Sequence, residues 1–169
     1  MSVWRIRKSL TMRFKSCSKF VPLFLLIGVA LTAQMAPELK IASQATVKVK
    51  RGAPATVTLK VSLPAGFHAN SNTPTEPNLI PLTLKWTGGP LQEGVITYPK
   101  PLMETYQFTA GKPISVVAGA FDVVTKFKVP AAAATGPSAQ TGTLRYQACN
   151  DRMCFPPKTV PVNVTVSVE

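Results

Sequence analysis

The sequence predicts an all-β fold, an immunoglobulin-like β-sandwich of roughly seven to nine short strands in a single domain. Apolar and polar residues alternate in short runs, which is the period-two pattern of half-buried strands. Turn signals rich in Gly and Pro separate the runs. The 16 prolines would interrupt most helices of useful length, and no long stretch has a helical period.

The expected strands follow this alternation along the chain. In the first, over 47–50, Val47 and Val49 point to one face and two lysines point to the other. The second, over 56–63, has four apolar residues on one face and polar residues opposite. The other runs cover 82–86, 95–98, 114–118, 123–129, 143–147 and 160–168. The last has valine at every second position, which predicts one continuous strand.

The connections between these strands carry turn residues at 64–66, 88–90, 111–113 and 136–137. The segment 131–140 is low in complexity and rich in alanine. We expect it to be an exposed connection between two strands, because too little chain follows it to form a second domain.

Residues 1–33 are predicted to be a signal peptide. A basic segment without acidic residues precedes an apolar run of about a dozen residues, and small residues follow it. The apolar run is short for a membrane-spanning helix, which needs about 20 residues. Cleavage after Ala33 would leave one exported domain, 34–169. The alternative is an uncleaved N-terminal membrane anchor.

The charge of the chain argues against a nucleic-acid-binding protein. The formal net charge is +12, but six of the 19 basic residues lie in the predicted leader. The others are scattered, whereas a nucleic-acid surface needs a dense basic patch with interleaved aromatic residues. We therefore expect no nucleic-acid partner.

Cys149 and Cys154 are the chemically distinctive residues of the expected mature domain. They enclose a turn-forming segment that begins Asn150-Asp151 and lies between two expected strands. Such a hairpin can bring the two Cα atoms to the separation of about 4.4–6.8 Å that a disulfide needs. An exported compartment is oxidising, so we expect the pair to be linked at least part of the time.

Three interpretations of the pair remain open from the residues alone. A structural disulfide that closes so short a loop contributes only about 2 kcal/mol. A redox-active pair is consistent with an exposed turn; Arg152 between the thiols favours a thiolate, whereas Asp151 opposes it, so the local charge does not decide. A metal site needs three or four ligands, and the mature chain adds only His68, which we expect to be an ordinary loop or strand-end residue.

The residues around the cysteines resemble a known family. Tyr146-Gln147-Ala148-Cys149 followed by Cys154-Phe155-Pro156-Pro157 is similar to the signature of the N-terminal periplasmic domain of DsbD, the bacterial thiol:disulfide interchange protein. Two upstream segments, 66–72 and 78–84, also resemble that family, through an aromatic-His-x-Asn motif and an Ile-Pro turn. The resemblance covers about residues 41–168.

The resemblance implies an immunoglobulin-like sandwich and disulfide exchange without an organic cofactor or a metal. It implies that Cys154 attacks a partner disulfide and that Cys149 resolves the mixed disulfide. It further implies a cap loop over the pair, matched here by 103–108, with Tyr106 or Phe108 as the shield and Glu104 assisting proton transfer. Beside the pair, the expected partner-docking residues are Tyr146, Phe155 and Pro156.

The implied partners are periplasmic thioredoxin-like or disulfide-isomerase-like proteins. DsbD continues into a membrane electron-transfer domain and a thioredoxin-like domain, whereas this sequence ends at Glu169. We therefore expect a separate membrane electron-transfer protein to supply electrons. The alternative is an exported β-sandwich that serves as a binding or structural module, with a purely structural disulfide.

Overall fold

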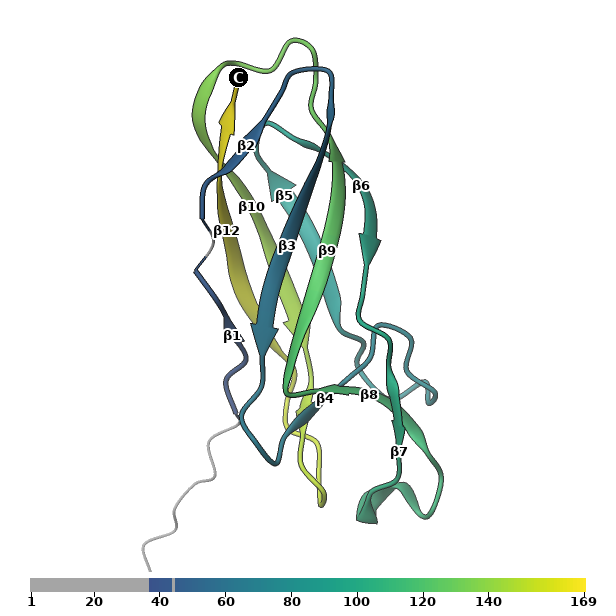
Figure 1. The fold of residues 1–169 in the computed structure, drawn as a ribbon. Coiled ribbons are helices and arrows are strands. Elements are labelled where there is room, and N and C mark those ends of the chain that lie inside the picture. The colour runs from purple at the N-terminus through teal and green to yellow at the C-terminus, as the bar shows by residue number, and fades with distance from the viewer. Residues whose placement is uncertain (1–36, 44) are drawn as a thin grey trace, which may run out of the picture. The chain divides into compact units, whose positions relative to one another are not determined.

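A computed structural model of the chain describes residues 37–43 and 45–169. The predicted signal peptide or anchor, 1–33, lies outside the described residues. Within the described part the chain forms twelve strands and one short 3-10 helix, arranged as an immunoglobulin-like sandwich (Figure 1). That part contains no helix long and apolar enough to cross a bilayer.

The twelve strands form three four-stranded sheets. Sheet A has the order β1 (Lys40–Ile41), β3 (Pro54–Ser62), β9 (Ala120–Lys128), β6 (Gln92–Thr97). Sheet B has the order β2 (Val47–Val49), β12 (Lys158–Val168), β10 (Gly136–Tyr146), β5 (Thr83–Gly88). Sheet C has the order β11 (Ala148–Cys149), β4 (His68–Asn70), β8 (Ile114–Ala118), β7 (Leu102–Glu104). Neighbouring strands are antiparallel, except that β2 runs parallel to β12.

Sheets A and B lie face to face, and sheet C lies at the end of the sandwich opposite the C-terminus (Figure 1). Alternate residues of the long strands point inward and fill the space between the two sheets, which is why the sequence alternates. Seven of these inward residues on β3 and β12 are at most 2% exposed: Val57, Leu59, Val61, Val162, Val164, Val166 and Val168.

Sheet C is built largely from continuations of the sandwich strands. β8 passes into β9 of sheet A through Gly119, and β10 of sheet B passes into β11 through Gln147. Gly119 has φ +64°, a left-handed conformation that glycine adopts without a steric penalty. Its carbonyl accepts a hydrogen bond from the N–H of Leu63 at 2.9 Å, which ties the crossing point to the end of β3.

The eight expected strand runs all correspond to strands, and the all-β prediction is confirmed. The prediction of an exposed connection over 131–140 was wrong in its second half. β10 begins at Gly136, and the whole of β10 pairs with β12. Gln140 is 2% exposed, and its side-chain oxygen accepts the N–H of Leu91 at 3.0 Å. Small residues over 136–140 concealed the alternation of this stretch.

Truncation of the core should destabilise the domain strongly. Leu59 is fully buried in β3, so Leu59→Ala should lower the free energy of unfolding by about 2–5 kcal/mol through lost burial and the cavity left behind. The matched control is the exposed neighbour, Lys60→Ala, with an expected change within about 0.5 kcal/mol. Urea unfolding of the disulfide-bonded domain measures both, and equal midpoints would contradict the assignment of the core.

Candidate functional site

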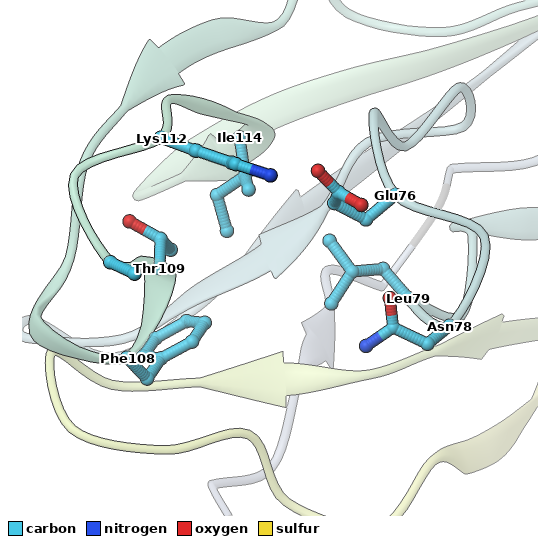
Figure 2. Close-up of a pocket in the computed structure, with 8 residues that line it drawn as sticks. Glu76, Asn78, Leu79, Phe108, Thr109, Lys112 and Ile114 are labelled. Atoms are coloured by element: carbon cyan, nitrogen blue, oxygen red, sulfur yellow. The ribbon is translucent and has the colours of Figure 1, made fainter.

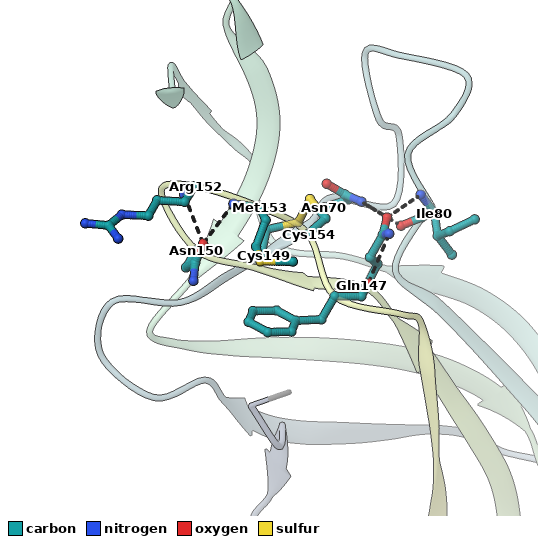
Figure 3. The surroundings of a disulfide bond; sticks show 9 residues. Asn70, Ile80, Gln147, Cys149, Asn150, Arg152, Met153 and Cys154 are labelled. Carbon is teal, nitrogen blue, oxygen red and sulfur yellow. Dashed lines mark hydrogen bonds between the residues drawn. A yellow bond between two sulfur atoms is a disulfide. The ribbon is translucent and has the colours of Figure 1, made fainter. Parts of the chain in front are cut away.

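The two cysteines lie directly opposite each other in a tight hairpin (Figure 3). Cys149 ends β11, and Cys154 pairs with it across an antiparallel bridge. The backbone hydrogen bonds flank this pair instead of joining it: Asn150 N–H to Met153 C=O at 2.9 Å, and Phe155 N–H to Ala148 C=O at 2.8 Å. Cys149 and Cys154 are therefore a non-hydrogen-bonded pair, the kind in which antiparallel strands approach most closely.

The sulfur atoms of Cys149 and Cys154 form a disulfide, and their Cα atoms are 3.9 Å apart. This separation is shorter than the range of about 4.4–6.8 Å expected from the sequence. The close approach follows from the ladder position, since the Cα atoms of such a pair lie only about 4.5 Å apart even without a disulfide.

Asn150 holds the tip of the hairpin through its side chain. Its Oδ1 accepts the backbone N–H groups of Arg152 and Met153, each at 2.9 Å (Figure 3). This is the local turn that an Asn at this position was expected to form. The turn fixes the connection between the cysteines without help from the disulfide.

The two cysteines differ in accessibility. Cys149 is 0% exposed, whereas Cys154 is half-buried. Cys149 is therefore closed to solvent, whereas part of Cys154 is open to it.

An aromatic segment covers the neighbourhood of the pair. Tyr106 precedes a short 3-10 helix, Gln107–Thr109, and its ring stacks on His68 with 3.9 Å between ring centroids and 11° between planes. Phe108 stacks on Tyr106 at 5.7 Å and 4°. The backbone N–H of Gln107 donates to the carbonyl of Asp151 at 3.2 Å, so the segment also contacts the tip of the cysteine hairpin.

The structure places the predicted cap residues 103–108 in two elements. Met103 and Glu104 belong to β7 and are exposed, and only the residues after them form the loop. Of the two candidate shields, Tyr106 lies nearer to His68. Its ring centroid is 3.9 Å from that of His68, whereas the ring centroid of Phe108 is 6.5 Å away. Burial, with a smaller contribution from the Glu104 carboxylate, raises the pKa of Tyr106.

His68 was expected to be an ordinary loop or strand-end residue, but it lies next to the cysteine pair. It begins β4, is 3% exposed, and is the ladder partner of Cys149. Its Nε2 has no hydrogen-bond partner among the described residues. Burial lowers the pKa of His68 from 6.5 to about 4, against a smaller opposing effect of Asp151, so the ring is neutral at pH 7.

Gln147 connects three segments around the pair (Figure 3). Its Oε1 accepts the side-chain N–H of Asn70 and the backbone N–H of Ile80, both at 3.0 Å, and its Nε2 donates to the carbonyl of Phe155 at 3.2 Å. Asn70 is fully buried and also donates to the carbonyl of Ile80 at 3.1 Å. The sequence did contain a sign that His68 and Asn70 lie together at the site. They are polar residues two positions apart, and such residues share one face of a strand.

Two of the three predicted docking residues are corrected by the structure. Tyr146 is 0% exposed, and its hydroxyl accepts the N–H of Leu39 at 3.0 Å, so it is a core residue and offers no surface to a partner. Phe155 is 6% exposed and packs near Phe67, with ring centroids 6.1 Å apart. Pro156 is exposed beside the pair.

An open cavity of about 250 Å³ lies beside the aromatic segment and includes Phe108 and Thr109 in its lining (Figure 2). Phe108 and Leu79 face each other across it, Ile114 forms its base, and Glu76 and Lys112 lie at its rim. Neither cysteine lines it. Among the described residues, no group of three or more His, Cys, Asp or Glu is arranged to hold a metal.

Fold and site together define an immunoglobulin-like domain with a capped disulfide hairpin. The structure is similar to the N-terminal periplasmic domain of ScsB from Proteus mirabilis, with a TM-score of 0.54 and 13% identity over 80% of this chain. The chain spans 49% of that structure. It is also similar to the reduced N-terminal domain of DsbD from Neisseria meningitidis, with a TM-score of 0.45 and 17% identity over 78% of this chain and 85% of that chain.

A further similarity joins the chain to AggA, the major subunit of aggregative adherence fimbriae type I from Escherichia coli. The TM-score is 0.40, with 10% identity over 79% of this chain and 95% of that chain. No protein-family model and no curated protein matches the sequence. At these identities the likeness to ScsB shows the shared sandwich fold, and the function has to be argued from the site.

Loss of the Gln147 side chain should loosen the site. Gln147→Ala leaves the N–H of Ile80 and the carbonyl of Phe155 without their partners, which should cost about 2–4 kcal/mol of unfolding free energy. The control is Gln92→Ala at an exposed position of β6, with an expected change within about 0.5 kcal/mol. Chemical denaturation measures the difference, and equal losses in the two variants would contradict the bridging role.

His68 should make the stability of the domain depend on pH. Its folded-state pKa lies below its unfolded value, so the unfolded chain binds the proton first as the pH falls from 6.5 to about 4. Folding stability should therefore fall in that window, by up to about 1.4 kcal/mol per pH unit, and be fully present above it. Urea unfolding from pH 4 to 7.5 should show a steeper fall for the wild type than for His68→Gln. Parallel curves would contradict the shift.

Proposed function

We propose that this chain is an exported thiol–disulfide exchange domain, which passes electrons to partner proteins through a reversible Cys149–Cys154 disulfide. The observation that carries the proposal is the pairing of one buried and one accessible cysteine in a single capped hairpin. Exchange requires a sulfur that a partner can reach and a second thiol close enough to resolve the mixed disulfide.

The order of the steps follows from accessibility. In the reduced domain, the Cys154 thiolate attacks a disulfide of the partner, and one sulfur of the partner leaves as a thiolate. Cys149 then attacks Cys154, reforms the internal disulfide and releases the second partner thiol. The domain loses two electrons, the partner gains two, and no organic cofactor or metal takes part.

The aromatic segment has a role in this proposal. Tyr106 and Phe108 shield the pair from adventitious thiols, and docking of a partner displaces the segment. Pro156, which is exposed beside Cys154, belongs to the docking surface. Glu104 ends β7 at the edge of the segment, where its carboxylate contributes to the raised pKa of Tyr106.

The proposed setting is the periplasm, with residues 1–33 as the leader and 34–169 as the mature domain. The partners would be thioredoxin-like or disulfide-isomerase-like proteins, and a separate membrane protein would supply electrons. The similar N-terminal domain of ScsB is periplasmic, which supports the setting by analogy of fold.

The small contribution of the disulfide to stability favours exchange over a structural role. Closure of a loop this short is worth about 2 kcal/mol, and the side chain of Asn150 already holds the turn. Breaking the disulfide should therefore leave the domain folded.

The reduction potential of the pair tests the proposal directly. Equilibration with glutathione buffers, followed by alkylation and mass measurement, should give a potential above about −300 mV, the level below which structural disulfides fall. A value well below it would overturn the proposal in favour of a structural disulfide. The double variant Cys149→Ser/Cys154→Ser is the control and should take up alkylating agent at neither position.

Trapping of a partner tests the order of the two cysteines. Cys149→Ala should accumulate mixed disulfides through Cys154 when incubated with an oxidised thioredoxin-like protein, because the resolving thiol is absent. Cys154→Ala should trap far less, since Cys149 is buried. Non-reducing electrophoresis and mass spectrometry read out both variants, and equal trapping would refute the assigned order.

A further inference from the structure

His68, Cys149 and Cys154 form one row across sheet C. Cys149 is the ladder partner of His68 on one side and of Cys154 on the other. Residues directly opposite each other in antiparallel strands project their side chains to the same face, with Cβ atoms about 4.5–5.5 Å apart. The imidazole of His68 is therefore the nearest basic group that the strand pairing brings to the buried thiol of Cys149.

The ring of His68 has an unused acceptor. Its Nε2 is buried and has no hydrogen-bond partner among the described residues while the disulfide is formed. Buried polar atoms are nearly always paired, and an exception calls for an explanation. Reduction of the disulfide creates a thiol on Cys149, which is a donor on the same face of the sheet.

We propose that His68 accepts the thiol proton of Cys149 when Cys149 resolves the mixed disulfide, and then returns this proton to the departing thiolate of the partner. The proposal rests on the exchange function argued above. It assigns His68 a chemical role that the sequence motif alone did not give it.

Burial of Cys149 makes an internal proton acceptor necessary. The thiolate, and not the thiol, is the nucleophile, and solvent does not reach a side chain that is 0% exposed. Proton transfer to His68 would create a thiolate and an imidazolium side by side, two opposite charges that stabilise each other away from water.

The groups that face His68 are compatible with this role. Tyr106 covers the ring from the aromatic segment, and Asp151 acts on it from the tip of the hairpin. On β8 the ladder partner of His68 is Ala118, which does not titrate. The negative charge of Asp151 favours the imidazolium, while burial keeps the ring neutral and able to accept a proton when the disulfide is intact.

The atoms and electrons of the step balance. After Cys154 has attacked the partner, its Sγ is bonded to one partner sulfur. The proton of Cys149 moves to Nε2 of His68, the thiolate attacks Sγ of Cys154, and the bond from Cys154 to the partner sulfur breaks. The Cys149–Cys154 bond forms, the partner sulfur leaves with the electron pair and takes the proton from His68, and His68 is neutral again.

Reaction of the reduced domain with 5,5′-dithiobis(2-nitrobenzoate) separates the two steps. Attack by Cys154 releases the first coloured thiolate, and resolution by Cys149 releases the second. The coloured thiolate leaves without taking up a proton. The rate of the second release therefore depends on deprotonation of Cys149 and not on proton return to the leaving group. Stopped-flow absorbance from pH 6 to 9 gives both rates.

His68→Phe keeps a flat ring under Tyr106, and His68→Gln keeps a hydrogen-bond acceptor, but neither can take up a proton. Both should slow the second release at pH 7 by at least about tenfold, and its rate should rise with pH toward the usual thiol pKa of about 8.5. The first release should change less than twofold. Leu59→Ala, which loosens the core between the sheets away from the hairpin, is the control for a general loss of stability and should keep the wild-type pH profile of the second release.

The outcomes separate this inference from the proposed function. A wild-type domain that releases only one thiolate would refute exchange itself. Two releases, with a second rate that is unchanged in His68→Phe or His68→Gln across the pH range, would refute the role of His68 alone. A second rate that is slowed equally in Leu59→Ala would also refute it, because a general loss of stability would then explain the effect.

A measurement on the wild type avoids any doubt about folding of the variants. His68 is the single histidine of the chain, so its imidazole signals in nuclear magnetic resonance need no assignment. If His68 faces the Cys149 thiol, its titration should shift when the disulfide is reduced, and the shift should be absent from Cys149→Ala treated with the same reductant. An identical titration of the oxidised and reduced wild type would overturn the proposal.

Discussion

The side-chain amide of Gln147 is the interaction on which the site depends. It lies where the chain leaves sheet B for sheet C, and it is the residue between β10 and β11. From that point it bonds to β4 through Asn70, to the following turn through Ile80, and to the residue after Cys154. Because these partners come from distant parts of the sequence, one amide sets the position of the hairpin relative to β4.

The chemistry proposed for the hairpin follows from this placement. With β11 held against β4, Cys149 is buried between His68 and Cys154, and Cys154 stays within reach of solvent. The aromatic segment then closes over His68 and touches the hairpin through a backbone hydrogen bond from Gln107 to Asp151. The difference in exposure between the two cysteines follows from this arrangement of strands, and the proposed order of attack and proton transfer rest on it.

The long strands could be predicted from the sequence because a strand with one buried face repeats every two residues. The four strands that were not expected, β1, β4, β7 and β11, have only two or three residues each, and none has the apolar residues two apart that marked the expected strands. Three of them belong to sheet C. The region that carries the candidate chemistry was therefore the least visible in the sequence.

The resemblance to a known family located the cysteine hairpin and the aromatic segment, but it did not separate surface from interior. Tyr146 and Phe155 flank the cysteines in sequence and were expected at a docking surface, yet both point into the protein. Neighbours along a strand point to opposite sides, so proximity in sequence to a reactive residue says little about exposure. His68 shows the converse, since 81 positions separate it from its ladder partner Cys149.

The position of the cysteine hairpin at the end of the sandwich (Figure 1) has a consequence for durability. The valine-rich interior between sheets A and B contains neither cysteine, so the part of the molecule that holds the chain together is not the part that changes covalently. A domain that is oxidised and reduced repeatedly, as proposed for this one, has to survive each cycle without unfolding. The covalent change of the proposed function is confined to a six-residue hairpin, and the interior of the sandwich takes no part in it.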